Sequence, residues 1–408
     1  MRASISRNDG LAVPRVDVDF SDPAVISDAF RVCEEIRAAG RVVWNGIQQG
    51  WMVTGFDDCS EVFSDTKGER FSMLGAYNPE ATFWFDAPNM IIVDGSEHRR
   101  LRQGLARCFT PAEIARRWEP RVREVVHDVL TPLIQSRQTV ELEDFTRLPV
   151  VIVAEMLGVP EEHHEDFRRW SLTVTGNASS AAFGHGRAEV RRMMDQALAE
   201  LNEYLTEEID RHRREKPDDL LTVMVEMPDW TEAEIRSGAV NLLLAGYDTT
   251  ARLMGDCLVA LQQHPDQRRL LVDEPALIPN AIEEVLRWIG VSQVLGRVVV
   301  RDTELAGTKL EAGDMVYLLL LAANRDPERW DDPDAFDVRR PFKGNHGFGG
   351  GAHICIGAPL ARLESRVALD ALLRVAPDYR LRDVEYANSF FNRSTVKGVI
   401  DVETFSHV

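Results

Sequence analysis

The chain has 408 residues, of which 44% are hydrophobic and 28% are charged, as is typical of soluble globular proteins. Its formal net charge of −19 argues against nucleic acid or an anionic membrane as the main partner. The five cysteines are scattered without paired spacing, which excludes a disulfide framework or a structural zinc site. The N-terminus lacks the apolar stretch of a signal peptide, and the longest apolar run, residues 315–323, is too short for a bilayer. We therefore expect a cytoplasmic protein without a membrane segment.

The order of elements predicts a mainly α fold with a smaller β-rich region. No internal repeat or low-complexity linker divides the sequence, so we expect a single domain over residues 1–408. Strand-forming side chains on both sides of a turn predict a β-hairpin over residues 41–54. A capping box with proline at the first helical position begins the helical part of the chain at Thr110. Amphipathic helices are expected over residues 121–134 and 190–214.

One predicted helix is much longer than the others. A capping box at Thr231 and Glu234 marks its start, and the pattern runs to Gln263, about 50 Å at a rise of about 1.5 Å per residue. Its centre, residues 241–250, is apolar on most sides and then abruptly polar, so we expect it to cross the middle of the molecule. The later elements are a helix over 280–288, strands over 298–301 and 315–320, a glycine-rich loop over 341–359 and a helix over 360–375.

The glycine-rich loop carries the strongest chemical signal. Its glycines allow the backbone to approach a flat molecule closely, and Cys355 stands just before a helix N-terminus. Backbone N–H groups and the helix dipole at that end stabilise a thiolate, which suits a ligand of iron. Taken alone, Cys355 is equally compatible with a small buried hydrophobic residue, the usual role of a free cysteine.

Four segments match one family pattern in the same order along the chain. Residues 245–249 match an oxygen-activation motif in a long central helix, and residues 284–287 match a Glu-x-x-Arg pair. Residues 324–339 match a segment that supplies a second arginine to that pair. The haem-binding signature is matched by Phe348, Gly349, Gly351, His353, Cys355 and Gly357. From about residue 41 to its end, the sequence therefore resembles the cytochrome P-450 family of haem-thiolate monooxygenases.

This resemblance implies the P-450 fold, with haem b between the long central helix and the helix after the cysteine loop. It implies that Cys355 ligates the iron, that Ala245 and Gly246 lie against the haem, and that Asp248 and Thr249 deliver protons during oxygen activation. Burying such polar groups without a task is costly. The residues leave one alternative open, because a threonine hydroxyl can instead donate to the carbonyl oxygen four residues earlier and bend the helix.

The resemblance also assigns ligands to the haem propionates. His98, Arg102, Arg297 and His353 fall where the family places these ligands. Without the resemblance, the i, i+4 spacing of His98 and Arg102 is equally typical of a solvated helix face. The polar cluster just before His98 is explained as a capping box formed by Asp94 and Glu97.

A structural role is implied for a charged triad of Glu284, Arg287 and Arg339. The i, i+3 spacing of the first two residues usually means a weak surface pair, whereas the resemblance implies a buried network. Removing one member of a buried network strands a charge and costs several kcal/mol.

The implied reaction inserts one oxygen atom of O2 into a hydrophobic small molecule, by hydroxylation, epoxidation or dealkylation. A thiolate ligand favours the necessary O–O cleavage. Electrons would come ultimately from NAD(P)H through a separate iron–sulfur ferredoxin and its reductase, because the sequence has no dinucleotide fingerprint and no cluster-binding cysteine set. The alternatives are a peroxide-dependent peroxygenase or a non-catalytic haem-binding protein, and neither needs Asp248 and Thr249.

A partner surface near the thiolate side and a substrate pocket roofed by the variable segments 71–90 and 171–186 are also expected. A positive face for the ferredoxin is predicted from Arg99, Arg100, Arg107, Arg116, Arg117, Arg362 and Arg366. An aromatic and apolar substrate pocket is predicted from Phe83, Trp84, Phe85, Phe183, Leu242 and Val294.

Overall fold

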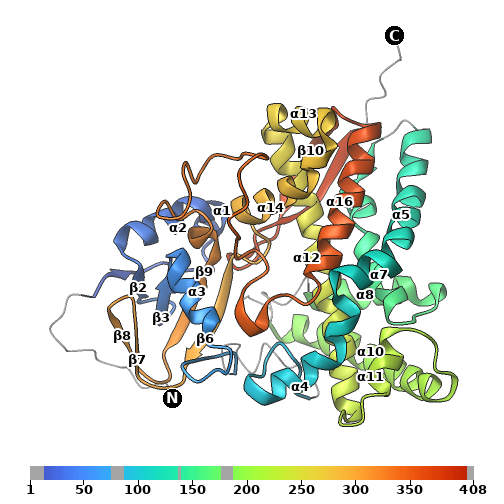
Figure 1. Cartoon of the computed structure of the whole chain (residues 1–408), viewed down its shortest axis with the longest axis horizontal. Coiled ribbons are helices and arrows are strands. Elements are labelled where there is room, and N and C mark those ends of the chain that lie inside the picture. The colour runs from blue at the N-terminus through green and yellow to red at the C-terminus, as the bar shows by residue number, and fades with distance from the viewer. Residues whose placement is uncertain (1–12, 75–86, 137–138, 176–186, 402–408) are drawn as a thin grey trace.

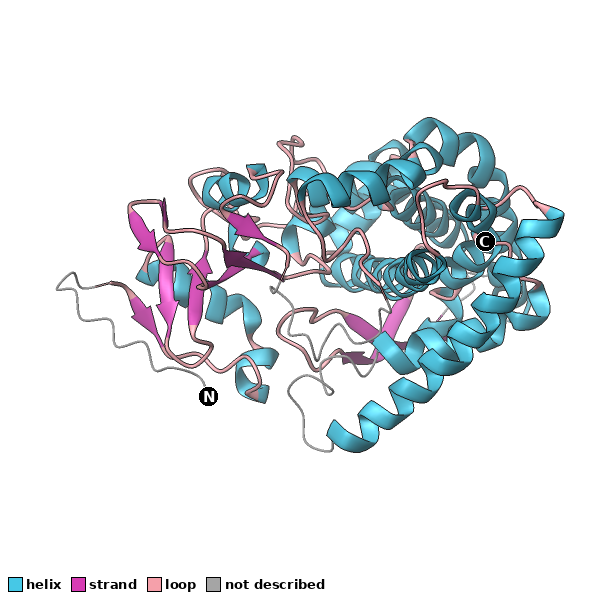
Figure 2. Ribbon diagram, turned by 90° about the horizontal axis from the view of Figure 1, so that it is seen from below, coloured by secondary structure: helices cyan, strands magenta, loops and turns pink. Residues whose placement is uncertain are grey.

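The computed structural model describes residues 13–74, 87–136, 139–175 and 187–401. The strands of the largest sheet gather on one side of the molecule and most helices on the other, whereas β10 of a second sheet lies beside α13 and α16; the long helix α12 (Glu232–Gln263) runs through the centre (Figure 1). The view from below shows the strand-rich part at one end and further strands beneath the helices (Figure 2). Within the described residues, no helix is long and apolar enough to cross a membrane. This arrangement is the mainly α fold with a smaller β-rich region that the sequence predicts.

The largest sheet joins strands from residues 15–72 with strands from residues 294–319. Its strand order is β1-β2-β3-β9-β6-β4, and the predicted hairpin is formed by the antiparallel pair β2 and β3, with Val42 opposite Val53. A second sheet has the order β10-β11-β5, and β7 and β8 form a separate hairpin. The strand bounds are β1 Arg15–Val16, β2 Val42–Asn45, β3 Gly50–Val53, β4 Phe71–Ser72, β5 Val140–Glu141, β6 Val294–Val299, β7 Thr303–Leu305, β8 Thr308–Leu310, β9 Met315–Leu319, β10 Arg380–Tyr386 and β11 Thr395–Asp401.

The helices agree with the predicted ones, apart from their ends. The amphipathic pattern over residues 121–134 is the second half of one longer helix, and the pattern over 190–214 lies inside another. The helix bounds are α1 Pro23–Ser27, α2 Ala29–Ala39, α3 Phe56–Ser64, α4 Gly95–Ala106, α5 Pro111–Ser136, α6 Leu142–Phe145, α7 Leu148–Met156, α8 His164–Thr175, α10 Arg187–Glu215, α11 Leu220–Val225, α13 Pro265–Asp273, α14 Ile278–Trp288, α15 Leu320–Ala323 and α16 Ala358–Val375.

Helix α12 is buried along most of its length, as its composition predicts. The capping box at its start is complete, because Thr231 Oγ1 accepts from the Glu234 N–H and the Glu234 carboxylate accepts from the Thr231 N–H. The helix packs against α7, α8 and α16, and its apolar residues belong to the largest core cluster. A long, rigid helix is therefore held from several sides, and it presents one face to the cavity described below.

Two expected local features are absent or shifted. Asp94 precedes α4 but makes no capping hydrogen bond there, so the capping box expected from Asp94 and Glu97 is wrong. The strand expected over residues 298–301 begins earlier, at Val294, because residues 294–298 pair along β9. In both cases the partner lies far away in sequence, and local pattern alone does not contain it.

Candidate functional site

A mainly apolar cavity of about 270 Å³ lies between α12 and the cysteine loop. Side chains from α7, α12, α14 and the segment around Met90 line it, together with the loop itself. On α12 the lining residues are Asn241, Leu242, Ala245, Gly246, Thr249, Thr250 and Leu253, which share one helical face. The cavity therefore brings together the two motifs that the sequence places more than a hundred residues apart.

The α12 face is shaped by a close helix contact and a side-chain hydrogen bond. A Cβ atom at Gly246 would lie 2.7 Å from Val153 Cγ2, so glycine lets α7 pack closely against α12 at the cavity. Thr249 Oγ1 donates to the Ala245 carbonyl oxygen at 2.6 Å, which is the back-bonding that the sequence left open. The Thr249 side chain is nevertheless exposed to the cavity, and its oxygen keeps lone pairs that can accept a hydrogen bond.

Asp248 is held by an ion pair on its own helix. Its Oδ2 lies 2.7 Å from Arg252 Nε, one turn further along α12, and Arg252 also donates to the Asn392 carbonyl oxygen at 3.1 Å. The Asp248 side chain is 22% exposed and does not line the cavity. In this arrangement the carboxylate and the Thr249 hydroxyl are neighbours in sequence, but the carboxylate is turned toward Arg252.

Glycines in left-handed conformations build the cysteine loop. Gly351 has φ +61°, and a Cβ atom there would lie 1.8 Å from the Phe63 carbonyl oxygen, so no other residue fits this turn. The Cys355 N–H donates to the Phe348 carbonyl oxygen at 2.9 Å and closes the loop. The guanidinium of Arg362 covers the Phe348 ring with 4.5 Å between the Cζ atom and the ring centroid. These contacts fix the loop and direct Cys355 toward the cavity.

The Cys355 side chain lines the cavity, and its exposed surface faces that space. Burial raises the pKa of this thiol, while the backbone N–H groups of Gly357 and Ala358 act in the opposite direction. The helix start thus supplies the donors expected from the sequence, although their effect on the pKa is smaller than that of burial. A bound cation at the sulfur would supply the missing stabilisation, because metal binding deprotonates a coordinating thiol.

A buried histidine pair lies beside the loop and tests whether a haem would fit. The rings of His98 and His353 are 4.2 Å apart between centroids, and His98 is only 2% exposed. Both His98 ring nitrogens are buried without a hydrogen-bond partner among the described residues, and burial lowers the pKa of this imidazole to about 4. An unsatisfied buried donor is costly. His98 does not itself line the cavity, whereas His353, whose ring packs against it, does. The pair therefore supplies nitrogen donors next to the cavity, which fits an acidic group such as a haem propionate.

His353 is held from its other side by Asp94. The His353 Nε2 atom lies 2.9 Å from Asp94 Oδ1, while Asp94 Oδ2 accepts from Ser72 Oγ at 2.6 Å and from the Met73 N–H at 2.8 Å. Burial would raise the pKa of Asp94, but the hydrogen bonds from His353, Ser72 and Met73 lower it to about 2. This ionised carboxylate ties β4, the start of α4 and the cysteine loop together.

Two arginines complete the polar edge of the cavity. Arg102 lies one turn after His98 on α4, lines the cavity and donates to the Ile354 carbonyl oxygen at 2.6 Å. Arg297 on β6 also lines the cavity and is 4% exposed. Its guanidinium carbon lies 5.6 Å from the centroid of the Phe63 ring. Of the four residues expected at the propionates, Arg102, Arg297 and His353 line the cavity, whereas His98 does not line it and packs against His353.

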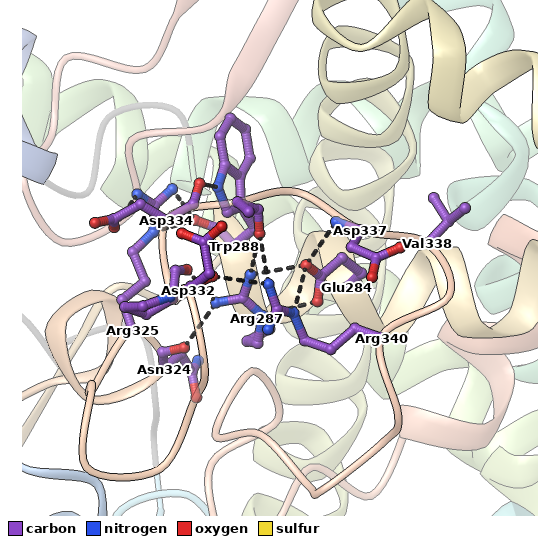
Figure 3. Close-up of polar contacts among 12 residues, drawn as sticks. Glu284, Arg287, Trp288, Asn324, Arg325, Asp332, Asp334, Asp337, Val338 and Arg340 are labelled. Atoms are coloured by element: carbon purple, nitrogen blue, oxygen red, sulfur yellow. Dashed lines mark hydrogen bonds and ion pairs between the residues drawn. The ribbon is translucent and has the colours of Figure 1, made fainter.

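The charged triad is present, but one member is different from the expected one (Figure 3). Glu284 and Arg287 form a bidentate pair with two N–O distances of 2.7 Å, and their side chains are 3% and 2% exposed. The second arginine is Arg340, whose Nε lies 3.1 Å from Glu284 Oε1. Arg339 is 51% exposed and pairs with Glu274, so the prediction of Arg339 is wrong.

The turn before these arginines explains the correction. The Asp337 N–H donates to Glu284 Oε1 at 3.0 Å, and the Arg340 N–H donates back to the Asp337 carbonyl oxygen at 3.0 Å. This turn directs the side chain of residue 340 inward and that of residue 339 outward. Because two arginines are adjacent in the sequence, the motif alone does not distinguish them.

The expected substrate-pocket residues have different outcomes. Leu242 lines the cavity as expected. Val294 does not, because it is buried in the core cluster behind the sheet, and Val291, Ser292 and Leu295 line the cavity instead. Phe83, Trp84, Phe85 and Phe183 lie outside the described residues.

Sequence reasoning missed three residues of the site region. Arg340 and Asp94 have the contacts given above, and Asn241 is a polar residue of the cavity lining. A signal for Asn241 was present, because it stands four and eight residues before Ala245 and Thr249 and therefore shares their helical face. No comparable signal exists for Asp94, whose partners come from distant segments.

Comparisons with known proteins agree with this site. A model of the cytochrome P450 family matches residues 182–375. The chain is 36% identical over 342 residues to mycinamicin IV hydroxylase/epoxidase of Micromonospora griseorubida, a match that covers 82% of this chain and 84% of that protein. It is 34% identical over 341 residues to vitamin D(3) 25-hydroxylase of Pseudonocardia autotrophica, which covers 81% of each. The chain belongs to the cytochrome P450 family and is a P450 monooxygenase.

Solved structures show the same architecture. The structure of P450BioI in complex with an acyl carrier protein ligated to hexadec-9Z-enoic acid superposes with a TM-score of 0.86 at 28% identity, covering 94% of this chain and 99% of that one. CYP109E1 from Bacillus megaterium in complex with testosterone gives a TM-score of 0.83 at 27% identity, covering 94% and 100%. The fold is the P450 fold, and the family is one of haem enzymes.

Proposed function

We propose that this protein oxidises a neutral, hydrophobic small molecule by inserting one oxygen atom from O2, with electrons delivered from NAD(P)H by a separate ferredoxin and its reductase. The observation that carries the proposal is that Cys355 and the Thr249 face of α12 line the same apolar cavity. When bound, haem supplies the oxygen-activating chemistry, and a thiolate ligand favours O–O cleavage.

The residues around the cavity would then have distinct roles in holding the haem. Cys355 would ligate the iron, while His98, Arg102, Arg297 and His353 would bind the propionates. Ala245 and Gly246 would leave room beside the macrocycle because neither carries a long side chain, and Phe348 and Gly357 would hold the loop in shape. The apolar lining excludes water from the substrate.

Thr249 and Asp248 would control proton delivery. The Thr249 hydroxyl donates to Ala245, so its oxygen can accept a hydrogen bond from a water molecule in the cavity. Asp248 would supply protons from the far side of α12 after its contact with Arg252 opens. A general acid typically contributes about 10²- to 10⁴-fold to a rate.

The proposed ferredoxin surface is less positive than its arginines suggest. Arg99 and Arg107 are exposed and form no ion pair with a described residue. The other five arginines all pair with carboxylates: Arg100 with Glu234, Arg116 with Glu113, Arg117 with Asp218, Arg362 with Glu283 and Arg366 with Glu119. Binding of the ferredoxin should therefore depend only weakly on salt, since few charges remain to attract it.

The test compares the wild type with Thr249→Ala and Asp248→Asn, each supplied with NADPH, a ferredoxin and a reductase. We expect both variants to take up electrons, but to form less product per NADPH, with Thr249→Ala releasing more peroxide. Unchanged coupling and rate in both variants would contradict the proton-delivery role. Turnover with peroxide alone, equal to that with the ferredoxin system, would favour the peroxygenase alternative. The cytoplasmic location stays a prediction.

A further inference from the structure

The polar side chains of the cavity are not all explained by haem binding. Within the described residues, the lining side chains with polar N or O atoms are Arg102, Asn241, Thr249, Thr250, Ser292, Arg297 and His353. Arg102, Arg297 and His353 lie at the propionate edge, and the hydroxyl of Thr249 is bonded to Ala245. Thr250 and Ser292 each offer a single hydroxyl. Asn241 is the remaining member of this set, and it carries a full amide.

Asn241 directs its amide to the cavity. The residue as a whole is only 3% exposed, it lines the cavity, and its amide makes no hydrogen bond with any residue that the structure describes. Asparagine is a poor helix former in the middle of a helix, and a polar amide facing an apolar cavity gains nothing from apolar contacts. Leucine at this position would suit both the helix and the apolar cavity better, so the amide has no role in folding that the structure reveals.

The position of Asn241 gives the geometry of a recognition site. It lies eight residues before Thr249 on the same face of α12, which corresponds to about 12 Å along the helix. The segment after Ala87 runs past this end of the helix, because the Ala87 N–H donates to Ser237 Oγ at 3.0 Å. That segment contributes Met90 and Ile91 to the lining. The amide therefore lies among apolar lining residues, eight residues before Thr249.

The same surroundings restrict the chemistry of the group that Asn241 binds. Among the described lining residues, the positive charges are those of Arg102, Arg297 and, when it is protonated, His353, all at the propionate edge. These cations are the ones assigned to the haem propionates, so a substrate carboxylate would have no countercharge of its own, and burying an unpaired charge is very costly. A neutral hydroxyl or carbonyl oxygen would satisfy the amide without such a cost.

We propose that Asn241 determines substrate specificity by hydrogen bonding a neutral hydroxyl or carbonyl oxygen, carried by an otherwise apolar substrate at the end remote from the oxidised carbon. This inference rests on the proposed function, since it places the reacting end of the substrate beside Thr249 and Cys355. A site that hydrogen-bonds a substrate oxygen rejects analogues that lack it, because its own polar group is then left unpaired.

An iron-anchored series of ligands tests this without knowledge of the natural substrate. The haem-loaded protein is titrated with 1-alkylimidazoles, from butyl to dodecyl, and with the matching imidazoles that carry a hydroxyl at the chain end. The imidazole nitrogen binds the iron, the spectral shift reports binding, and the chain length positions the hydroxyl. For each length, the ratio of the two dissociation constants isolates the contribution of the terminal oxygen.

In the wild type we expect one range of chain lengths at which the hydroxyl improves binding about three- to tenfold relative to its neighbours in the series. Asn241→Leu should remove this maximum while binding the alkylimidazoles at least as tightly. Asn241→Gln should move the maximum to a shorter chain, because its amide reaches one methylene further. Ser292→Ala, which removes a hydroxyl from another element of the lining, should leave the maximum unchanged.

The outcomes separate the inference from the proposed function. If the wild type and Asn241→Leu show the same hydroxyl-to-alkyl ratio at every length, Asn241 does not recognise a substrate oxygen, although haem binding stands. If no imidazole shifts the spectrum, the iron is not accessible from the cavity, and both proposals are overturned. Equal haem content in all variants, measured beforehand, excludes a loss of folding as the cause.

Discussion

Two polar clusters of the molecule differ in how completely their hydrogen bonds are formed. In the Glu284 cluster, both carboxylate oxygens and the guanidinium groups of Arg287 and Arg340 have protein partners. In the cavity cluster, both nitrogens of His98 have none, and the amide of Asn241 has none among the described residues.

This difference distinguishes buried polar groups that stabilise the fold from those that bind a ligand. A buried charge network that is fully paired is complete without a ligand, so its task is to hold α14 against the loop that precedes the cysteine. A buried polar group without a partner raises the free energy of the protein. Beside the cavity, a bound ligand can supply the missing partner. The predictions below test this distinction.

The largest effect is expected at Cys355. Cys355→Ser should abolish the long-wavelength carbon monoxide band of the reduced protein, since oxygen replaces the thiolate sulfur as the ligand. Cys108→Ser is the matched control, because Cys108 is a partly buried free cysteine that does not line the cavity. A retained thiolate band in Cys355→Ser would place the iron ligand elsewhere.

The next effect separates Arg340 from its neighbour. Glu284→Ala should lower the free energy of unfolding by about 3–5 kcal/mol, because it strands two buried guanidinium groups. Arg340→Ala should cost about 2 kcal/mol, since Glu284 keeps its pair with Arg287. Arg339→Ala should change stability by less than about 0.5 kcal/mol, because this side chain is exposed. Chemical denaturation measures all three, and equal costs for Arg339→Ala and Arg340→Ala would contradict the observed triad.

Asp256 is intermediate between the fully hydrogen-bonded Glu284 cluster and the unpartnered nitrogens of His98, because only one of its carboxyl oxygens has a well-formed hydrogen bond. Asp256 on α12 accepts from the N–H and the hydroxyl of Thr395 through Oδ1, while its buried Oδ2 lies near Ser394 without a well-formed hydrogen bond among the described residues. Burial raises the pKa of Asp256 to about 6, so the folded protein holds this proton more tightly than the unfolded chain does. Stability should therefore fall as pH rises from about 4 to 6, by up to about 3 kcal/mol from this group.

Asp256→Asn should flatten that part of the pH profile, because the amide does not ionise. The measurement is the free energy of unfolding at pH 4, 5, 6 and 7 in the wild type and the variant. An unchanged slope would show that Asp256 is not the group that titrates. Asp370→Asn serves as the control, since that carboxylate already pairs with Arg374 on α16.

The smallest effect on stability is expected at His98. Replacing this residue should leave the apoprotein as stable as before or slightly more stable, but should weaken haem binding. His98→Phe removes two unsatisfied nitrogens, so the haem-free protein should be unchanged or about 1 kcal/mol more stable. The same change should speed haem release about tenfold, because a hydrogen bond to a charged group is lost. Haem transfer to apomyoglobin and unfolding of the apoprotein measure the two effects. A variant that loses stability without losing haem faster would make His98 a structural residue.

Much of the fold follows from local pattern. The capping box at Thr231 and the uninterrupted apolar centre predict α12, and strand-forming residues on both sides of a turn predict the hairpin of β2 and β3. The spacing of glycines around Cys355 predicts the loop, since only glycine adopts φ +61° next to the Phe63 backbone. These features are determined by sequence because their physical causes lie within a few residues.

Tertiary structure alone decided the remaining details of the site. Arg340, and not Arg339, pairs with Glu284, and Val294 is buried in the core instead of lining the cavity. Asp94 does not cap its own helix but accepts hydrogen bonds from His353, Ser72 and Met73. In each case the choice depends on which distant atom offers the better contact. Sequence spacing fixes which residues are close along the chain, whereas the direction of a side chain is set by packing and hydrogen bonds between segments that meet only in the folded protein.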